Sequence, residues 1–254
     1  MKHNRLRRTL LWVTSNNGKN IEDAIASKAD VLCFDLEDGI PDAQKADARA
    51  MAAKALSELD FRGKERVVRI NPLGSSESQQ DLEKILPTIP DAIRLPKCES
   101  VDYVLTLDRI LSDFEKRNNL EENTIEIILM IETAKGLIHC YDMASCCPRV
   151  SAMGIGMEDM TASLGVPRIY ELNTNDLIYP RQKLVVSARA ANVQALDSCV
   201  LFLGDLDYVE KETIISKRNG FEGRSIFDIS HIDICNRIFT PSPDEVEWAL
   251  KVLE

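Results

Sequence analysis

Short apolar runs rich in β-branched residues alternate along the chain with longer segments of helical periodicity. Each apolar run ends on polar groups and is too short to be a buried helix, so we interpret the runs as strands. Eight strands are expected, at residues 9–15, 31–38, 66–71, 92–97, 125–132, 151–159, 198–203 and 224–228.

Helices are expected in most of the intervals, at residues 43–59, 79–86, 101–117, 181–194 and 210–218. A last helix is predicted at Pro243–Leu253, with Ser242 as its N-cap and Val246, Ala249, Leu250 and Leu253 on one face. Strands that alternate with helices favour a parallel sheet with crossover connections. Eight such units in 254 residues predict an α/β fold, a TIM (β/α)8 barrel that forms one domain over residues 1–254.

Charged residues stand at or just beyond the ends of five successive strands: Asp35, Arg69, Lys97, Glu132 and Asp159. Their spacings of 34, 28, 35 and 27 residues average 31, close to the roughly 32 residues of one barrel unit. The pattern therefore predicts that the five side chains meet at the carboxyl ends of the strands, where barrel enzymes carry their chemistry. The alternative is that charges simply mark strand ends.

Two of these groups, Glu132 and Asp159, follow neighbouring strands and are expected to converge. Two carboxylates with open positions beside them suit Mg²⁺, or Mn²⁺ as an alternative, because these ions take oxygen ligands and leave room for substrate oxygens. The other interpretation is that each acid caps the helix after its strand, which fits Asp159 better than Glu132.

The turn Asp35-Leu-Glu-Asp38 crowds three carboxylates into four residues. Such crowding is costly unless a metal-bound water or basic groups compensate it. For Asp38 the start of a helix before Pro41 is an equally good explanation, whereas Asp35 and Glu37 are expected to face the barrel interior. The guanidinium of Arg69 suits a bidentate grip on a substrate carboxylate, or a structural pairing with the acidic turn, or both.

Other motifs point to no further chemistry. Gly154-Ile-Gly156 lacks the rest of a dinucleotide fingerprint, so we discount NAD and expect the glycines to admit substrate or a neighbouring backbone. His139 and His231 belong to no catalytic signature and are interpreted as surface or packing residues.

Composition narrows the partners and the compartment. The net charge of −10 disfavours nucleic acid and anionic membranes. The seven scattered cysteines are expected to be buried free thiols. The apolar run after Arg8 is too short for a secretion signal, so a cytoplasmic protein is expected.

Several of these pieces, in this order and spacing, resemble the HpcH/HpaI aldolase and citrate lyase family, in its citrate lyase β-subunit-like branch. The resemblance covers nearly the whole chain. It rests on Arg8-Thr-Leu-Leu-Trp-Val13, Asp35-Leu-Glu-Asp38 with Lys45 and Arg49, Val68-Arg-Ile-Asn71, Leu95-Pro-Lys97, Ile131-Glu-Thr-Ala134, Gly156-Met-Glu-Asp-Met160, Gly220-Phe-Glu-Gly223 and Phe239-Thr-Pro-Ser242.

The resemblance implies a TIM barrel, often a trimer, in which Glu132 and Asp159 hold Mg²⁺ and Arg69 contacts the metal-bound acid. It implies a carbon–carbon lyase that cleaves or forms a 3-hydroxyacyl-CoA ester, such as citryl-, malyl- or citramalyl-CoA, into an acyl-CoA and a 2-oxo acid. Substrate contacts are expected from Arg69, Arg8, Gly156, Met157 and Glu158, and acid–base catalysis from Glu37 and Asp38.

Three departures from the family pattern keep other functions open. Ile226-Phe-Asp228 replaces the usual Ile-His-Pro, Val13-Thr-Ser15 replaces Val-Pro-Gly, and the usual C-terminal lid is expected to be missing after Phe239-Thr-Pro-Ser242. The alternatives are a class II aldolase acting on a free 4-hydroxy-2-oxo acid and a non-catalytic subunit of a larger complex. The expected partners are a small-molecule substrate and further copies of the chain in a trimer or hexamer.

Overall fold

Eight parallel strands close into a barrel in the computed structural model, which describes residues 5–253 apart from 16, 168, 170–176 and 203. The strands follow one another around the barrel in chain order, and β1 pairs with β8 to close it. Their bounds are β1 Thr9–Thr14, β2 Val31–Asp35, β3 Glu65–Arg69, β4 Ala92–Leu95, β5 Glu126–Ile131, β6 Val150–Ile155, β7 Gln194–Asp197 and β8 Gly223–Ile226. The expected TIM barrel is confirmed.

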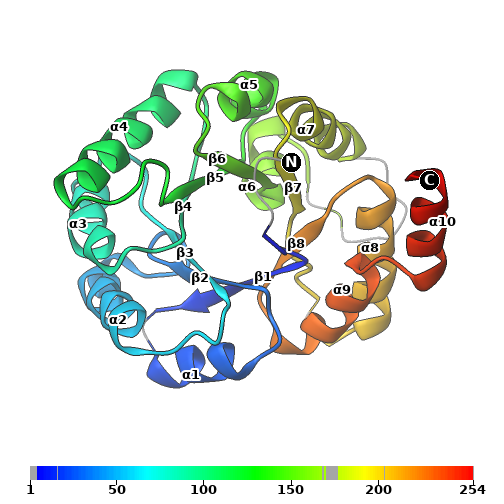
Figure 1. The fold of residues 1–254 in the computed structure, drawn as a ribbon, viewed down its shortest axis with the longest axis horizontal. Coiled ribbons are helices and arrows are strands. Elements are labelled where there is room, and N and C mark those ends of the chain that lie inside the picture. The colour runs from blue at the N-terminus through cyan, green and yellow to red at the C-terminus, as the bar shows by residue number, and fades with distance from the viewer. Residues whose placement is uncertain (1–4, 16, 168, 170–176, 203, 254) are drawn as a thin grey trace.

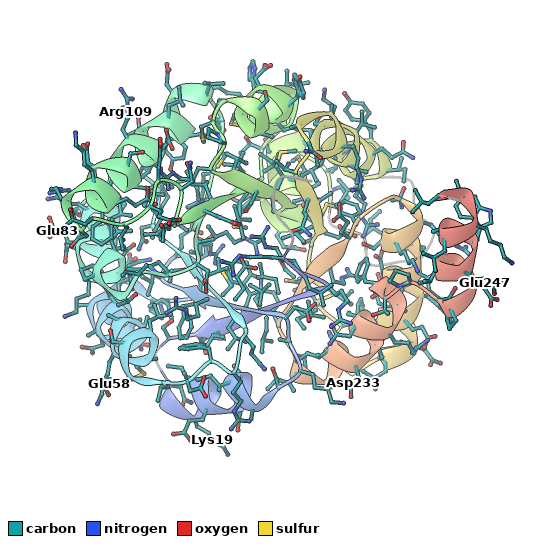
Figure 2. The ribbon with its side chains drawn as sticks, viewed as in Figure 1. Lys19, Glu58, Glu83, Arg109, Asp233 and Glu247 are labelled. Atoms are coloured by element: carbon teal, nitrogen blue, oxygen red, sulfur yellow. The ribbon has the colours of Figure 1, made fainter. Side chains whose placement is uncertain are left out.

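Helices surround the barrel as an outer ring (Figure 1). Charged side chains on them, such as Lys19, Glu58 and Arg109, point outward into solvent (Figure 2). The α-helices are α1 Gly18–Ala26, α2 Lys45–Glu58, α3 Ser76–Ile85, α4 Val101–Arg117, α5 Ala134–Ser145, α6 Met157–Leu164, α7 Ile178–Ala191, α8 Leu206–Arg218, α9 Ile232–Phe239 and α10 Pro243–Leu253. Short 3-10 turns are η1 Asp42–Gln44, η2 Leu86–Thr88 and η3 Ile229–His231.

One strand lies elsewhere than predicted. The seventh was expected at residues 198–203, but β7 is Gln194–Asp197, and residues 198–202 form a loop at the carboxyl end of the barrel. Leu203 lies outside the described residues. The apolar sequence of this loop resembles a strand, yet Leu201 and Phe202 are partly exposed, and the strand itself is only four residues long.

The amino end of the barrel is closed by a polar cluster. The buried guanidinium of Arg7 donates to Glu65 at 2.7 Å, to Glu126 and to Gln194, which are the first residues of β3, β5 and β7. A layer of interior side chains lies above this cluster and includes Leu10, Val31, Cys33, Val67, Ala92, Ile128, Ala152 and Leu196. The described interior is therefore packed at its amino end, and a cavity lies at its carboxyl end.

The seven cysteines form no disulfide, and all but the half-buried Cys146 are buried. This agrees with the expected free thiols. Within the part of the chain that the structure describes, no helix is both long and apolar enough to cross a bilayer.

Candidate active site

The five charged groups at the strand ends come together at the carboxyl end of the barrel, as their spacing predicts. The ammonium Nζ of Lys97 lies at the centre, 3.1 Å from Oδ2 of Asp159, 3.4 Å from Oδ2 of Asp38 and 3.6 Å from Oε1 of Glu37. Although burial opposes it, these carboxylates raise the pKa of Lys97. One cation therefore holds together acids from two segments, the turn after β2 and the start of α6.

Arg69 forms the second cationic centre. Asp35 and Arg69 are paired in the register of β2 and β3, so the guanidinium meets the carboxylate in a bidentate pair with two N–O distances of 2.7 Å. Burial opposes ionisation of Asp35, but the hydrogen bonds and charge of Arg69 outweigh it and lower the pKa of Asp35. Arg69 Nη1 also lies 2.9 Å from Oε2 of Glu37. The structural pairing with the acidic turn is thus present, and Arg69 still lines the cavity described below.

Glu37 is the buried acid of the turn. Its two carboxylate oxygens contact Arg69 and Lys97 as ion pairs, but neither makes an aligned hydrogen bond within the described residues. Burial raises the pKa of Glu37 to about 7. The turn is fixed from below by Lys45, whose Nζ donates to the carbonyl oxygens of Leu36 and Glu37. Glu37 is therefore held in place and has a pKa suited to proton transfer near neutral pH.

Glu132 and Asp159 are used differently from helix caps. The N-cap of α5 is Thr133 and that of α6 is Gly156, so neither acid caps the helix that follows its strand. Glu132 instead accepts a hydrogen bond of 2.9 Å from the backbone N–H of Lys97, whose φ of 52° is a left-handed conformation that costs a non-glycine residue free energy. The capping interpretation is wrong for both acids. Asp38 likewise precedes η1 and α2 and lies outside their first turns.

Two glycines make room for side chains of the site. A Cβ on Gly156 would lie 2.6 Å from Cγ of Glu132, and a Cβ on Gly154 would lie 2.7 Å from Nη2 of Arg94. We expected the glycines to admit substrate or a backbone segment. The nearest groups are the side chains of Glu132 and Arg94 rather than backbone. Gly156 also lines the cavity described below, so close approach of substrate there stays a prediction.

The donor set fits a hard divalent cation. Within the described residues no three His, Cys, Asp or Glu side chains gather as a metal site. Mg²⁺, however, needs only one or two protein carboxylates and takes its other ligands from water and substrate. Glu132 and Asp159 line the same cavity, and burial raises the pKa of Glu132, as does the neighbouring charge of Asp159. A bound cation would relieve this repulsion.

The cavity between these groups has a volume of about 290 Å³. Its apolar wall includes Trp12 of β1, which stacks on Phe227 with ring centroids 6.2 Å apart. The guanidinium carbons of Arg69 and Arg94 lie 4.4 and 4.6 Å from the centroid of the Trp12 ring. Trp12, Arg94 and Phe227 had no role predicted from the sequence, and Lys97 was named only as a charge at a strand end and as part of a family motif.

Most residues expected to bind substrate line this cavity, among them Gly156, Met157 and Glu158 at the start of α6. Arg8 does not. It precedes β1 at the amino end of the barrel, where its guanidinium pairs with Asp30 and donates to Thr240. We therefore remove Arg8 from the substrate-binding set. Arg8 instead has a structural role, because it links the start of β1 to Asp30 before β2 and to Thr240 after α9.

Neither His139 nor His231 takes part in the site. His139 is exposed, and His231 is fully buried after β8. Both placements agree with the interpretation of surface and packing residues.

Comparison with known proteins agrees with this geometry. Citrate lyase subunit beta from Leuconostoc mesenteroides subsp. cremoris is 31% identical over 253 residues, which are 100% of this chain and 83% of that protein. The mitochondrial citramalyl-CoA lyase of Rattus norvegicus is 31% identical over 97% of this chain and 75% of its own length.

A similar fold is known experimentally. The crystal structure of protein CitE from Mycobacterium tuberculosis, in complex with magnesium, acetoacetate and coenzyme A, matches with a TM-score of 0.79 and 27% identity, over 100% of this chain and 87% of that one. Residues 8–228 match the family described as HpcH/HpaI aldolase/citrate lyase, whose members are metal-dependent carbon–carbon lyases. The chain belongs to the HpcH/HpaI aldolase/citrate lyase family.

Proposed function

We propose that this protein is a Mg²⁺-dependent lyase that cleaves or forms a 3-hydroxyacyl-CoA such as citryl-, malyl- or citramalyl-CoA. The products of cleavage are an acyl-CoA and a 2-oxo acid. The observation that carries the proposal is the pair of carboxylates, Glu132 and Asp159, that faces one cavity together with Arg69, whose guanidinium is paired with Glu37. The magnesium, acetoacetate and coenzyme A bound by protein CitE and the names of the curated relatives support it.

Glu132 and Asp159 would hold the Mg²⁺, with Mn²⁺ as an alternative, because they supply oxygen ligands beside a cavity open to substrate. When bound, the ion supplies Lewis-acid stabilisation of the oxygen that becomes the carbonyl of the 2-oxo acid. Arg69, which lines the cavity, would bind the substrate carboxylate. Asp35 fixes the orientation of Arg69 through the bidentate pair.

Glu37 is the best candidate to take the hydroxyl proton as the carbon–carbon bond breaks. Its pKa of about 7 leaves a substantial ionised fraction at neutral pH and lets the same group return a proton. The positive charges of Arg69 and Lys97 stabilise negative charge that develops on oxygen. Asp38, whose side chain is largely exposed at the mouth, is the weaker candidate for proton transfer.

The turn after β8 gives a specific reason to keep the aldolase alternative. Phe227 lines the cavity and stacks on Trp12, and Asp228 caps the next turn by accepting from the N–H of Ser230. Hence the place of the usual His-Pro is taken by an aromatic wall and a local cap. A free 4-hydroxy-2-oxo acid would fit such a wall without needing a coenzyme A contact there.

Replacing Glu132 with Ala tests the function. The variant should lose Mg²⁺-dependent cleavage by about a thousandfold, because the metal supplies several kcal/mol of transition-state stabilisation. Turnover is assayed with citryl-, malyl- and citramalyl-CoA and with 4-hydroxy-2-oxo acids, by following acyl-CoA and 2-oxo acid release. Glu83→Ala, on the exposed face of α3, is the matched control.

The outcomes separate the candidates. Cleavage of the thioesters supports the lyase, and cleavage of the free acids alone supports the aldolase. A Glu132→Ala variant with unchanged Mg²⁺-dependent turnover and an unchanged circular dichroism spectrum would contradict the metal assignment. A wild-type protein that binds no Mg²⁺ and cleaves none of the substrates would favour the non-catalytic subunit.

We also propose that the chain is a single domain that works in the cytoplasm as a homo-oligomer, a trimer or a hexamer, with no nucleic acid or membrane partner. The free thiols support a reducing compartment. The exposed apolar residues of α10, among them Trp248, Leu250 and Leu253, support an interface there.

A further inference from the structure

One buried guanidinium in the barrel is incompletely paired. Arg94 of β4 is fully buried and extends across the interior, where it lines the inner end of the cavity. Its Nη2 donates to Ser225 Oγ of β8 at 3.1 Å, but Nε and Nη1 have no hydrogen-bond partner within the described residues. Buried polar groups are nearly always hydrogen-bonded, so two unmatched donors on one charged side chain require an explanation.

The contrast with Arg69 is informative because the two residues occupy paired positions on β3 and β4. Arg69 is neutralised by Asp35 and Glu37. No ion pair of 4 Å or less with an acid is found for Arg94 among the described residues; its charged neighbours are Arg69 and, at longer range, Glu132. Burial lowers the pKa of Arg94, and the charge of Arg69 lowers it further. The Trp12 ring gives Arg94 only the face of an aromatic group.

The fold makes room for this arginine. Gly154 on β6 has no side chain, and a Cβ there would lie 2.7 Å from Nη2 of Arg94. The adjacent interior positions on β1 and β8 are Trp12 and Ser225, and neither is charged. A buried guanidinium without a countercharge is unfavourable, and a carboxylate with two oxygens matches its free donors.

We propose that Arg94 binds a second carboxylate of the substrate, so that the preferred 2-oxo acid is a dicarboxylate and not a monocarboxylate. The inference rests on the proposed function and narrows its substrate class. Arg69, Glu132 and Asp159 engage the end of the molecule that carries the 2-oxo acid group. Arg94 receives the other carboxylate at the inner end of the cavity, beside Ser225.

The test measures binding of two acids by isothermal titration calorimetry in the presence of Mg²⁺. The probes are freshly prepared oxaloacetate, which has the second carboxylate, and pyruvate, which lacks it. We expect the wild-type protein to bind oxaloacetate at least tenfold more tightly than pyruvate. Quenching of tryptophan fluorescence gives an independent readout, since Trp12 lies against both arginines.

Arg94→Met keeps an unbranched apolar stem and removes the guanidinium with its charge. It should weaken oxaloacetate binding at least tenfold and leave pyruvate binding within about twofold, and Arg94→Lys should recover part of the preference. Arg109→Met, on the exposed face of α4, is the control. Should Arg94→Met fail to fold, Arg94→Lys and the wild-type ratio still give the answer.

The outcomes distinguish this inference from the proposed function. Equal affinity of the wild type for the two acids, or equal loss of both in Arg94→Met, would overturn the role of Arg94 while leaving a Mg²⁺-dependent 2-oxo acid site intact. It would mean that the unmatched donors are satisfied by buried water. If neither acid binds the wild-type protein with Mg²⁺, the proposed function fails and this inference fails with it.

Discussion

Single residues without side chains shape this site as much as those with charge. Gly156 lies beside Glu132, and the carboxylate can take its position only because no Cβ is present. Gly154 does the same for Arg94. Such positions act on the chemistry through their neighbours, since neither glycine carries a functional group.

Gly156→Ala should therefore move the carboxylate of Glu132, because the new Cβ would lie 2.6 Å from its Cγ. We expect Mg²⁺ affinity to fall by about 10- to 100-fold, as for other changes that disturb the orientation of a metal ligand. Calorimetric titration with Mg²⁺ measures this. Gly18→Ala, where an added Cβ meets nothing within 4 Å, is the control. An unchanged Mg²⁺ affinity would show that Glu132 does not hold the ion.

For single residues, the sequence predicts where charged side chains lie better than it predicts which groups they contact. Asp35, Arg69 and Glu132 could be placed together because each stands at or directly after the end of a strand, and strand ends in a barrel share one rim. Arg94 could not be recognised, because an arginine within Ala92-Ile-Arg-Leu95 normally indicates a side chain that reaches solvent. Its true position depends on Gly154, which is far away in sequence and becomes a neighbour only when the barrel closes.

At the scale of elements, six helices were predicted near their observed positions, but α5 was missed, as were the shorter α1, α6 and α9. The helix at Val101–Arg117 has the predicted bounds, and α10 begins with a capping box in which Ser242 and Glu245 exchange hydrogen bonds. The strand β7 was missed because Gln194 and Asp197 have low strand propensity and the following loop is more apolar. Closure of the barrel, a long-range effect, decides which of the two segments pairs with β6 and β8.

The connection from β8 to α9 contains a buried titratable group. His231 ends η3, and its two ring nitrogens have no hydrogen-bond partner within the described residues. Burial lowers its pKa, Asp228 opposes this shift and Arg224 adds to it. The folded chain thus binds the proton less readily than the unfolded chain. The free energy of unfolding should fall as the pH drops below about 6.5, with a limiting slope of about 1.4 kcal/mol per pH unit.

Urea unfolding of the wild type and of His231→Gln at pH 7.5 and pH 5.5 checks this. The wild type should lose more stability than the variant between the two pH values, because glutamine does not titrate. Equal losses would show that His231 takes up its proton as easily in the folded protein as in the unfolded chain.

At the scale of the whole molecule, helix α10 is the feature that contributes no buried side chain to the barrel. Helix α10 lies at the periphery beside α8 and α9 (Figure 1), and none of its described side chains is buried. Val246, Leu250 and Leu253 repeat at helical spacing, which is the pattern of a face that packs against a partner.

One chain has a mass of 28.5 kDa. We therefore expect the wild-type protein in solution to have three or six times this mass. Leu250→Glu should shift it toward the monomer, because a charge on the apolar face would be buried at the interface. Size-exclusion chromatography with light scattering measures the mass, with Glu247→Gln on the same helix as the control. A wild-type mass of one chain would contradict the proposed oligomer.

The polar cluster around Arg7 fills the amino end of the barrel, so we expect substrate and products to pass through the carboxyl end. Cleavage of the carbon–carbon bond in this cavity would produce an acyl-CoA and a 2-oxo acid, and both would have to leave through the carboxyl end. The 2-oxo acid, bound by Arg94 in our proposal, would leave only after the acyl-CoA has dissociated. We therefore expect the two products to be released in a fixed order, which is determined by residues that do not contact the bond being broken.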